Sequence, residues 1–275
     1  MTDLVTVLAI TGAAGLATGL GALPVFFRAR VSHRTYDAAL GLAAGIMVAA
    51  SVFGLILPGM DEGGLGTVSI GVFLGGFVLL AGNRAIPHLH ARYRGWRAEG
   101  GATRGDALSM GFDGTGSLSE GDERDGRFRR ALLIGGAITL HNAPEGLAMG
   151  VAFASGLEEV ALLLAVVIGL QNVPDGFAFA VPMGETGMSN GRVLLYTALS
   201  GLVPQVLAAT FGYLVVSVAT GLFPVAAGFA AGAMLAVVFR ELIPSSHGHG
   251  HADAATAAFL VGFVLLVVVD ELLVV

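Results

Sequence analysis

Two short stretches of this chain place polar side chains inside otherwise apolar runs. They read HNAPEG, starting at His141, and QNVPDG, starting at Gln171, and share an asparagine, a proline, an acidic residue and a glycine in the same order. In a helix His141 and Glu145 lie one turn apart on one face, and so do Gln171 and Asp175. Asn142 and Asn172 lie beside them, and packing of the two helices is expected to bring all six side chains together as candidate metal ligands. Imidazole, carboxylate and amide oxygen suit Zn²⁺, Fe²⁺, Mn²⁺ or Co²⁺. Because these ligands bind metal deprotonated, affinity should weaken as the pH falls through the imidazole range.

Each stretch also carries a proline that frees a backbone carbonyl. Pro144 and Pro174 lack an N–H, so the carbonyls of Leu140 and Leu170 lose their helical hydrogen bonds and a kink is expected at each. Inside a membrane such a carbonyl has to face protein, water or an ion. Gly146 then permits a neighbouring helix to approach closely.

The composition places these motifs in a bilayer. The chain has 275 residues, 55% hydrophobic and 12% charged, with a mean hydropathy of +0.81, whereas soluble domains carry about 25% charged residues. Continuous apolar runs near the roughly 20 residues that cross a bilayer predict an all-α integral membrane protein with eight transmembrane helices. Their approximate bounds are 4–27, 38–60, 63–83, 131–157, 160–182, two spans within 193–239, and 254–275. The absence of cysteine excludes disulfides and thiolate metal sites.

The arginines predict the orientation. All fourteen basic residues are Arg, and they follow the first, third, fifth and seventh spans. The positive-inside rule then puts the arginine side in the cytoplasm and both termini outside, in the plasma membrane. Residues 1–275 are expected to form one transporter domain. Residues 88–128, which are polar and lack periodicity, are expected to form a flexible cytoplasmic loop.

With these motifs the chain resembles prokaryotic members of the ZIP (Zrt/Irt-like protein) family of divalent-metal transporters. HNAPEG is similar to the family's fourth-helix motif and QNVPDG to its fifth, and AAGIMVAAS, SGLVPQ and RELIP extend the resemblance over nearly the whole chain. The resemblance implies a 3+2+3 arrangement of the helices, with the outer triplets related by inverted symmetry. It also implies transport of zinc, or of iron, manganese, cobalt or cadmium, into the cytoplasm. The metal would be the substrate, and neither a prosthetic cofactor nor a nucleic-acid partner is expected.

Residue by residue, the resemblance implies where the metal binds. The first ion would be held by His141, Glu145, Gln171 and Asp175, with Met47 as a soft additional ligand. An adjoining second ion would use Asn142, with Glu145 and Asp175 bridging. The candidates for a cytoplasmic exit are Glu241, His247, His249 and His251. For the three histidines a solvated glycine-rich turn is an equal alternative.

Three departures from the family pattern weaken the second site. Bacterial relatives often have Asp in place of Asn172 and Glu in place of Asp175. They also commonly have Glu after SGLV, where this chain has Pro204 and then Gln205. The two formal negative charges that remain balance one divalent ion better than two. One well-formed metal site and a weak or absent second one are therefore expected.

Other functions remain as alternatives. The motifs could form a hydrogen-bonded clasp without metal, or Glu145 and Asp175 could carry protons for an organic-solute carrier. An intramembrane metal-dependent hydrolase fits less well, because the chain has no HExxH motif and His141 is the single histidine deep in a span. The chain is therefore not expected to be an enzyme. Small-residue runs such as GLAAG and GGFVLLAG could pack helices within one protomer or between the protomers of a homodimer.

Overall fold

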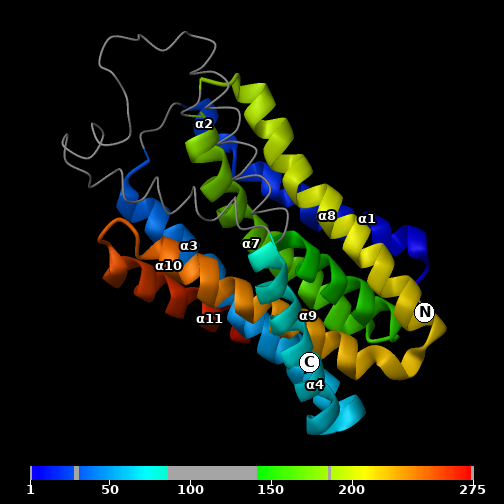
Figure 1. Cartoon of the computed structure of the whole chain (residues 1–275). Coiled ribbons are helices and arrows are strands. Elements are labelled where there is room, and N and C mark those ends of the chain that lie inside the picture. The colour runs from blue at the N-terminus through cyan, green and yellow to red at the C-terminus, as the bar shows by residue number, and fades with distance from the viewer. Residues whose placement is uncertain (1, 28–30, 86–140, 185–186, 274–275) are drawn as a thin grey trace.

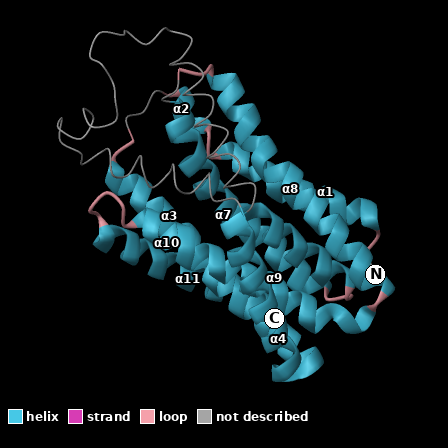
Figure 2. Ribbon diagram, in the orientation of Figure 1, coloured by secondary structure: helices cyan, strands magenta, loops and turns pink. Residues whose placement is uncertain are grey.

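The computed structural model describes four stretches of the chain, residues 2–27, 31–85, 141–184 and 187–273. In these stretches the chain is helical and has no strand, which confirms the all-α prediction (Figure 2). Six of the described helical runs are long and apolar enough to cross a membrane: Leu4–Phe26, His33–Gly82, Glu158–Gly184, Asn190–Val218, Phe223–Ser246 and Ala252–Leu272. The predicted loop 88–128, and residues 131–140 of the predicted fourth span, lie outside the described residues.

Figure 1 shows these helices as one bundle. In chain order they are α1 Leu4–Leu20, α2 Leu23–Phe26, α3 His33–Ala49, η1 Ala50–Ile56, α4 Leu57–Ala85, the helical residues 141–154, α7 Glu158–Gly184, α8 Asn190–Val218, η3 Thr220–Leu222, α9 Phe223–Val237, η4 Val238–Leu242, α10 Ile243–Ser246 and α11 Ala252–Leu273. Asp3 caps α1 by accepting a hydrogen bond of 3.0 Å from the backbone N–H of Thr6. That bond, with a second from the Thr6 hydroxyl, lowers the pKa of the Asp3 carboxyl.

The run His33–Gly82 is 50 residues long, more than twice what a bilayer needs. It turns sharply at Gly64, where φ is 76°, a backbone conformation that glycine adopts at little cost. A Cβ added to Gly59 would lie 3.0 Å from the Val68 side chain, so the two arms of the turn are in contact. The turn falls beside the predicted boundary between the runs 38–60 and 63–83.

Three helix pairs build most of the bundle: α1 packs against α8, α3 against α11, and α4 against α9. Glycines allow the close contacts. A Cβ on Gly45 would lie 2.0 Å from the carbonyl oxygen of Phe259 on α11, and one on Gly232 would lie 2.0 Å from that of Val72 on α4. The GLAAG run therefore packs helices within one protomer.

The sequence around these glycines occurs twice. GLAAGIMVA, 41–49, and GFAAGAMLA, 228–236, share six of nine residues. Each is followed by a π-helical segment. The first stretch leads into η1 at the next residue, and the second leads into η4 one residue later, after Val237. The chain thus uses one local sequence to make the same kind of close helix contact in two places.

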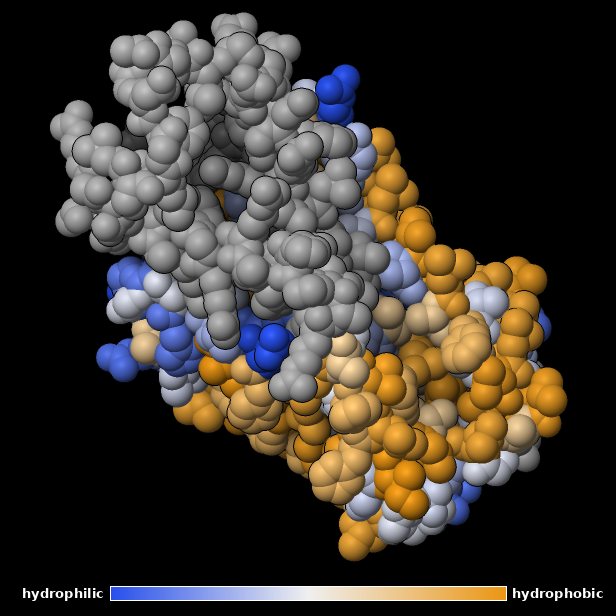
Figure 3. All heavy atoms as spheres, viewed as in Figure 1, coloured by the Kyte–Doolittle hydropathy of each residue, from blue (hydrophilic) through white to orange (hydrophobic). Residues whose placement is uncertain are grey.

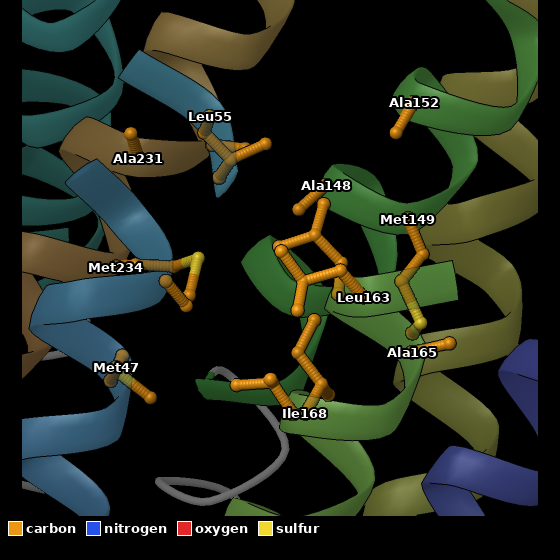
Figure 4. Packing of buried hydrophobic residues seen from close by; sticks show 14 of the residues in the cluster. Met47, Leu55, Ala148, Met149, Ala152, Leu163, Ala165, Ile168, Ala231 and Met234 are labelled. Atoms are coloured by element: carbon orange, nitrogen blue, oxygen red, sulfur yellow. The ribbon is translucent and has the colours of Figure 1, made fainter. Parts of the chain in front are cut away.

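The core lies where α3, residues 141–154, α7 and α9 meet. Figure 4 shows Met47 and Met234 on one side of this hydrophobic cluster and Ala148 and Ile168 on the other, all fully buried. The outer surface is also apolar: Phe73 is 78% exposed, and Figure 3 shows apolar residues spread over much of the described surface in view. An apolar surface of this extent suits contact with lipid rather than with water.

We predict that Gly45→Ala destabilises the protein while Gly82→Ala does not. The Gly45 change forces α3 and α11 apart, and overpacking of this kind costs about 1–3 kcal/mol. Gly82 is a matched helical control, since a Cβ there meets nothing within 4 Å among the described residues. The apparent melting temperature of the detergent-purified protein measures both. Equal melting temperatures for the two variants would contradict the tight α3–α11 contact.

Candidate metal site

The two polar motifs lie on neighbouring helical segments in the interior. HNAPEG opens the described part of the 141–154 helix, and QNVPDG lies in α7, which stays helical through Pro174. All six polar candidates are buried, with exposed fractions of 0–8%: His141, Asn142, Glu145, Gln171, Asn172 and Asp175.

The glycine that ends each motif brings a further helix close. A Cβ on Gly146 would lie 2.0 Å from the carbonyl oxygen of Gln205 on α8, which confirms the close approach predicted there. A Cβ on Gly176 would lie 1.8 Å from the carbonyl oxygen of Thr18 on α1. The repeated glycine therefore has the same role in both motifs, and α1 and α8 enclose the site.

A direct hydrogen bond joins the two motifs. The side-chain amide of Gln171 donates to Oε1 of Glu145. Asp175, one turn further along α7, interacts electrostatically with both Glu145 and His141. The structure thus brings together the four residues to which the first metal was assigned on resemblance.

Several oxygens at this junction have no hydrogen-bond donor among the described residues. They are Oε2 of Glu145, Oε1 of Gln171, Oδ1 of Asn172 and Oδ1 of Asp175, and all four are buried. A buried polar atom left without a partner costs about 1–3 kcal/mol, and more if it is charged. Proteins compensate buried charges by pairing them or by binding metal. The donor set, two carboxylates and two amides beside an imidazole, suits one divalent ion.

His141 has its own partner. Its Nε2 lies 2.6 Å from Oε2 of Glu241, a residue of η4. In the described part of the chain no three His, Asp or Glu side chains already form a metal-binding group. Glu145 is bonded to Gln171 while Nε2 of His141 contacts Glu241, so an ion beside the two carboxylates would take Nδ1 of the imidazole or displace Glu241 from Nε2.

The amides of the second motif connect helices instead. Nδ2 of Asn172 donates to the carbonyl oxygen of Ala14 at 2.7 Å and to Oε1 of Gln205 at 3.0 Å. Nε2 of Gln205 in turn donates to the carbonyl oxygen of Thr11 at 3.4 Å. This network holds α7 against α1 and α8. The contacts of Asn172 with α1 were not predicted, because small residues such as Ala14 carry no signal of a polar partner.

The remaining candidates lie elsewhere. Met47 is fully buried in the hydrophobic cluster (Figure 4), and Nδ2 of Asn142 reaches the carbonyl oxygen of Ser200 at 3.5 Å. His247 and His251 are exposed in the turn after α10, while His249 contacts Asp37. Of the four exit candidates, only Glu241 contacts a residue of the two motifs in the described structure.

Comparison with known proteins identifies the family. The family model described as ZIP zinc transporter matches residues 113–270. The chain belongs to the ZIP family. The zinc transporter GufA of Myxococcus xanthus is 36% identical over 266 residues, covering 94% of both chains. The zinc transporter ZIPB of Bordetella bronchiseptica is 38% identical over 273 residues, covering 95% of this chain and 80% of its own.

The family extends to animals: zinc transporter ZIP11 of Homo sapiens is 34% identical over 319 residues, covering 92% of this chain and 93% of its own. These matches confirm the predicted resemblance. Because the relatives are named transporters, the prediction that this ZIP protein is not an enzyme is also confirmed. With its apolar helices of membrane-spanning length, it is a multi-pass membrane protein.

We predict that Asn172→Ala lowers the apparent melting temperature of this ZIP protein. The change removes the donor to Ala14 and Gln205 and leaves buried acceptors unpaired, at a cost of about 1–3 kcal/mol. Ser155→Ala is the control, because among the described residues the Ser155 hydroxyl donates within its own segment, to the carbonyl of Val151. A thermal unfolding series in detergent compares the two. A shift no larger for Asn172→Ala than for the control would show that the amide network does not hold α7 in place.

Proposed function

We propose that this ZIP protein transports a divalent transition-metal ion, with zinc as the first candidate, into the cytoplasm through the site between residues 141–154 and α7. The observation that carries the proposal is the set of four buried oxygens without donors, held by two helices beside His141. A metal ion supplies a partner for three of these oxygens, those of Glu145, Gln171 and Asp175. The names of the relatives, all zinc transporters, agree with that chemistry.

The proposed ligands of the ion are His141, Glu145, Gln171 and Asp175. The two carboxylates balance the charge of one divalent ion, and the imidazole and amide complete a mixed N/O set that zinc accepts at about 2.0–2.2 Å. Met47 is proposed as an additional soft ligand on the resemblance alone, since a buried methionine also serves simply to fill space.

The second site is proposed to be weak or absent. Where charged side chains would be needed, Asn172 and Gln205 are neutral and hydrogen-bonded to each other at 3.0 Å. Asn172 also uses its N–H group on α1. Both amides are thus committed to holding helices together, which supports transport with a single metal ion in this site.

Release is proposed to proceed past Glu241 toward the arginine-rich face. Glu241 already contacts the ligand His141, so the carboxylate can take over the ion as the histidine lets go. The orientation rests on the arginines: Arg34 lies at the start of α3, and Arg240 lies beside Glu241. By the positive-inside rule this side faces the cytoplasm of a cell whose plasma membrane holds the protein, and both termini lie outside.

The proposed frame is eight spans in a 3+2+3 arrangement. The sharp turn at Gly64 divides the run His33–Gly82 into two spans, and residues 141–154 supply part of another. The contacts support inverted triplets. The first three spans contain α1, α3 and α4, and the last three contain α8, α9 and α11. If each span of the first triplet is exchanged with its counterpart in the second, the α3–α11 pair becomes the α9–α4 pair and the α1–α8 pair is unchanged. The nine-residue repeat in α3 and α9 fits the same exchange.

Metal uptake into proteoliposomes tests the proposal. We expect saturable uptake of Zn²⁺, compared with Fe²⁺, Mn²⁺ and Cd²⁺, and a loss of about tenfold or more in His141→Ala, Glu145→Gln and Asp175→Asn, because each removes a ligand. Glu158→Gln is a matched control, since Glu158 accepts a hydrogen bond from Thr2 at 2.7 Å, away from both motifs. A chain that carries none of these ions, or whose uptake survives the ligand changes, does not transport metal through this site. Proton-coupled solute uptake would then be the next assay.

Converting the amide pair tests how many ions the site holds. We expect Asn172→Asp combined with Gln205→Glu to raise bound zinc by one equivalent over the parent protein, because two added carboxylates offset the charge of a second divalent ion. Metal analysis of the purified proteins after gel filtration gives the count. The parallel variant Asn172→Asp alone shows whether one added charge suffices. An unchanged count in the double variant would mean that charge does not limit the second site.

A further inference from the structure

A buried aspartate lies outside the two motifs, near the start of α3. Asp37 is fully buried, although it is only four residues from the first residue of the helix. Its Oδ1 lies 2.7 Å from Nδ1 of His249 in the turn before α11. Its Oδ2 is also buried and has no hydrogen-bond partner among the described residues. One carboxylate oxygen is therefore paired and the other is left for a further partner, which for buried charges is commonly a hydrogen-bond donor or a metal ion.

A second imidazole lies beside the first. His33 is four residues before Asp37, so both lie on one face of α3. The rings of His33 and His249 stack with their centroids 4.5 Å apart and 15° between their planes. Figure 1 shows the turn between α10 and α11 lying near the start of α3. The spacing of His33 and Asp37 is that of His141 and Glu145, which hold the proposed transport site.

Tyr36 connects this cluster to α7. Its ring lies edge-on to His249 at 5.7 Å, and its hydroxyl donates to the carbonyl oxygen of Ala178 at 3.2 Å. Ala178 follows Asp175 by three residues, a rise of about 4.5 Å along the helix. The cluster is therefore beside the part of α7 that comes directly after the transport ligands, on the arginine-rich side.

We propose that Asp37, His249 and His33 form a second site for a divalent metal ion such as Zn²⁺ or Co²⁺. Two imidazoles and one carboxylate are a common three-ligand set for zinc, with water in the fourth position. We assign this site the ion that has passed the transport site, and that assignment rests on the proposed function. The binding of metal by these three residues does not rest on it.

Binding of an ion between His249 and Asp37 would require a small separation of the two side chains. Two ligands on a tetrahedral zinc are about 3.3 Å apart, so the 2.7 Å between Nδ1 of His249 and Oδ1 of Asp37 has to widen by about 0.6 Å. The turn that carries His249 permits this: the His249 side chain is 38% exposed, and Gly250 has a φ of 85°. His33 is exposed at the helix start, and binding the ion would require its ring to rotate out of the stack.

The neighbouring histidines provide matched controls. Nδ1 of His247 faces its own segment, 2.9 Å from the Ser246 hydroxyl and 3.0 Å from the carbonyl oxygen of Ile243. His251 is exposed. Neither has a contact with Asp37 among those of the described residues. If the turn merely collected metal through its histidines, these two would matter as much as His249.

The test uses the full-length protein in detergent, with His141→Ala and Glu145→Ala in the background to remove the transport site. Co²⁺ titration followed by visible absorption reports the number, affinity and geometry of the remaining ions. We expect one tetrahedral equivalent, with its Kd raised about tenfold or more by Asp37→Asn or His249→Ala, and little changed by His247→Ala or His251→Ala.

Two results would overturn the site. One is the absence of tetrahedral cobalt in the background protein. The other is an equal loss of cobalt affinity in His247→Ala, His249→Ala and His251→Ala, which would mean adventitious binding by the turn. If Asp37→Asn lowers the melting temperature of the metal-free protein, its effect on cobalt binding could come from misfolding. The variant His33→Ala, at the exposed helix start, then serves as the test, and an unchanged Kd for Co²⁺ rejects the site. Wild-type uptake is measured separately, so a failure of transport with cobalt still bound in the background protein counts against the proposed function alone.

Discussion

Two carboxylates buried among apolar helices are the constraint on which the rest of this structure depends. Glu145 is completely buried and Asp175 almost so, and in a bilayer each would cost several kcal/mol without compensation. The hydrogen bond from Gln171 satisfies one oxygen, and the proposed metal ion would compensate the remaining carboxylate oxygens. The close packing around them has the same origin, because Gly146 and Gly176 let α8 and α1 approach until the site is closed on both sides. The stability of the fold and the binding of metal are thus opposed at Glu145 and Asp175. Replacing these carboxylates by apolar side chains would favour folding but would remove the site.

The bundle around the site is built from a contact that the chain makes twice. Gly41 and Gly45 bring α3 to α11, and Gly228 and Gly232 bring α9 to α4, within nearly the same nine-residue sequence. Helices in lipid gain little from burying apolar surface, so close backbone approach and dispersion have to hold them together. Glycine at every fourth position supplies that approach. Both helices then enter π-helical segments, a local change of winding that often accompanies functional sites, and the second of these carries Glu241.

The proposed path of the ion runs past side chains that already contact one another. His141 is bonded to Glu241 and Glu145 to Gln171, so the imidazole is shared between the proposed site and the proposed exit. The Asn172–Gln205 pair has the opposite character, because its amides are bonded to backbone on α1 and to each other. Neutral groups with several partners make firm helix contacts, whereas charged groups with few partners can exchange them for metal. The same distinction applies to Asp37, whose one described partner lies on a glycine-containing turn.

The sequence by itself determined the class of fold, the family and the six polar candidates. Continuous apolar runs and the two phased motifs depend on local spacing alone, as does the turn between 38–60 and 63–83, where Asp61 and Glu62 precede the glycines. The tertiary structure decided which side chains pair across helices. Three contacts depend on helices far apart in the chain: Glu241 with His141, Asn172 with α1, and the buried Asp37 with His249. A single acidic residue near a helix start, such as Asp37, is indistinguishable in sequence from a solvated one. Its burial follows from tertiary packing around the start of α3, including its contact with His249 in the turn before α11.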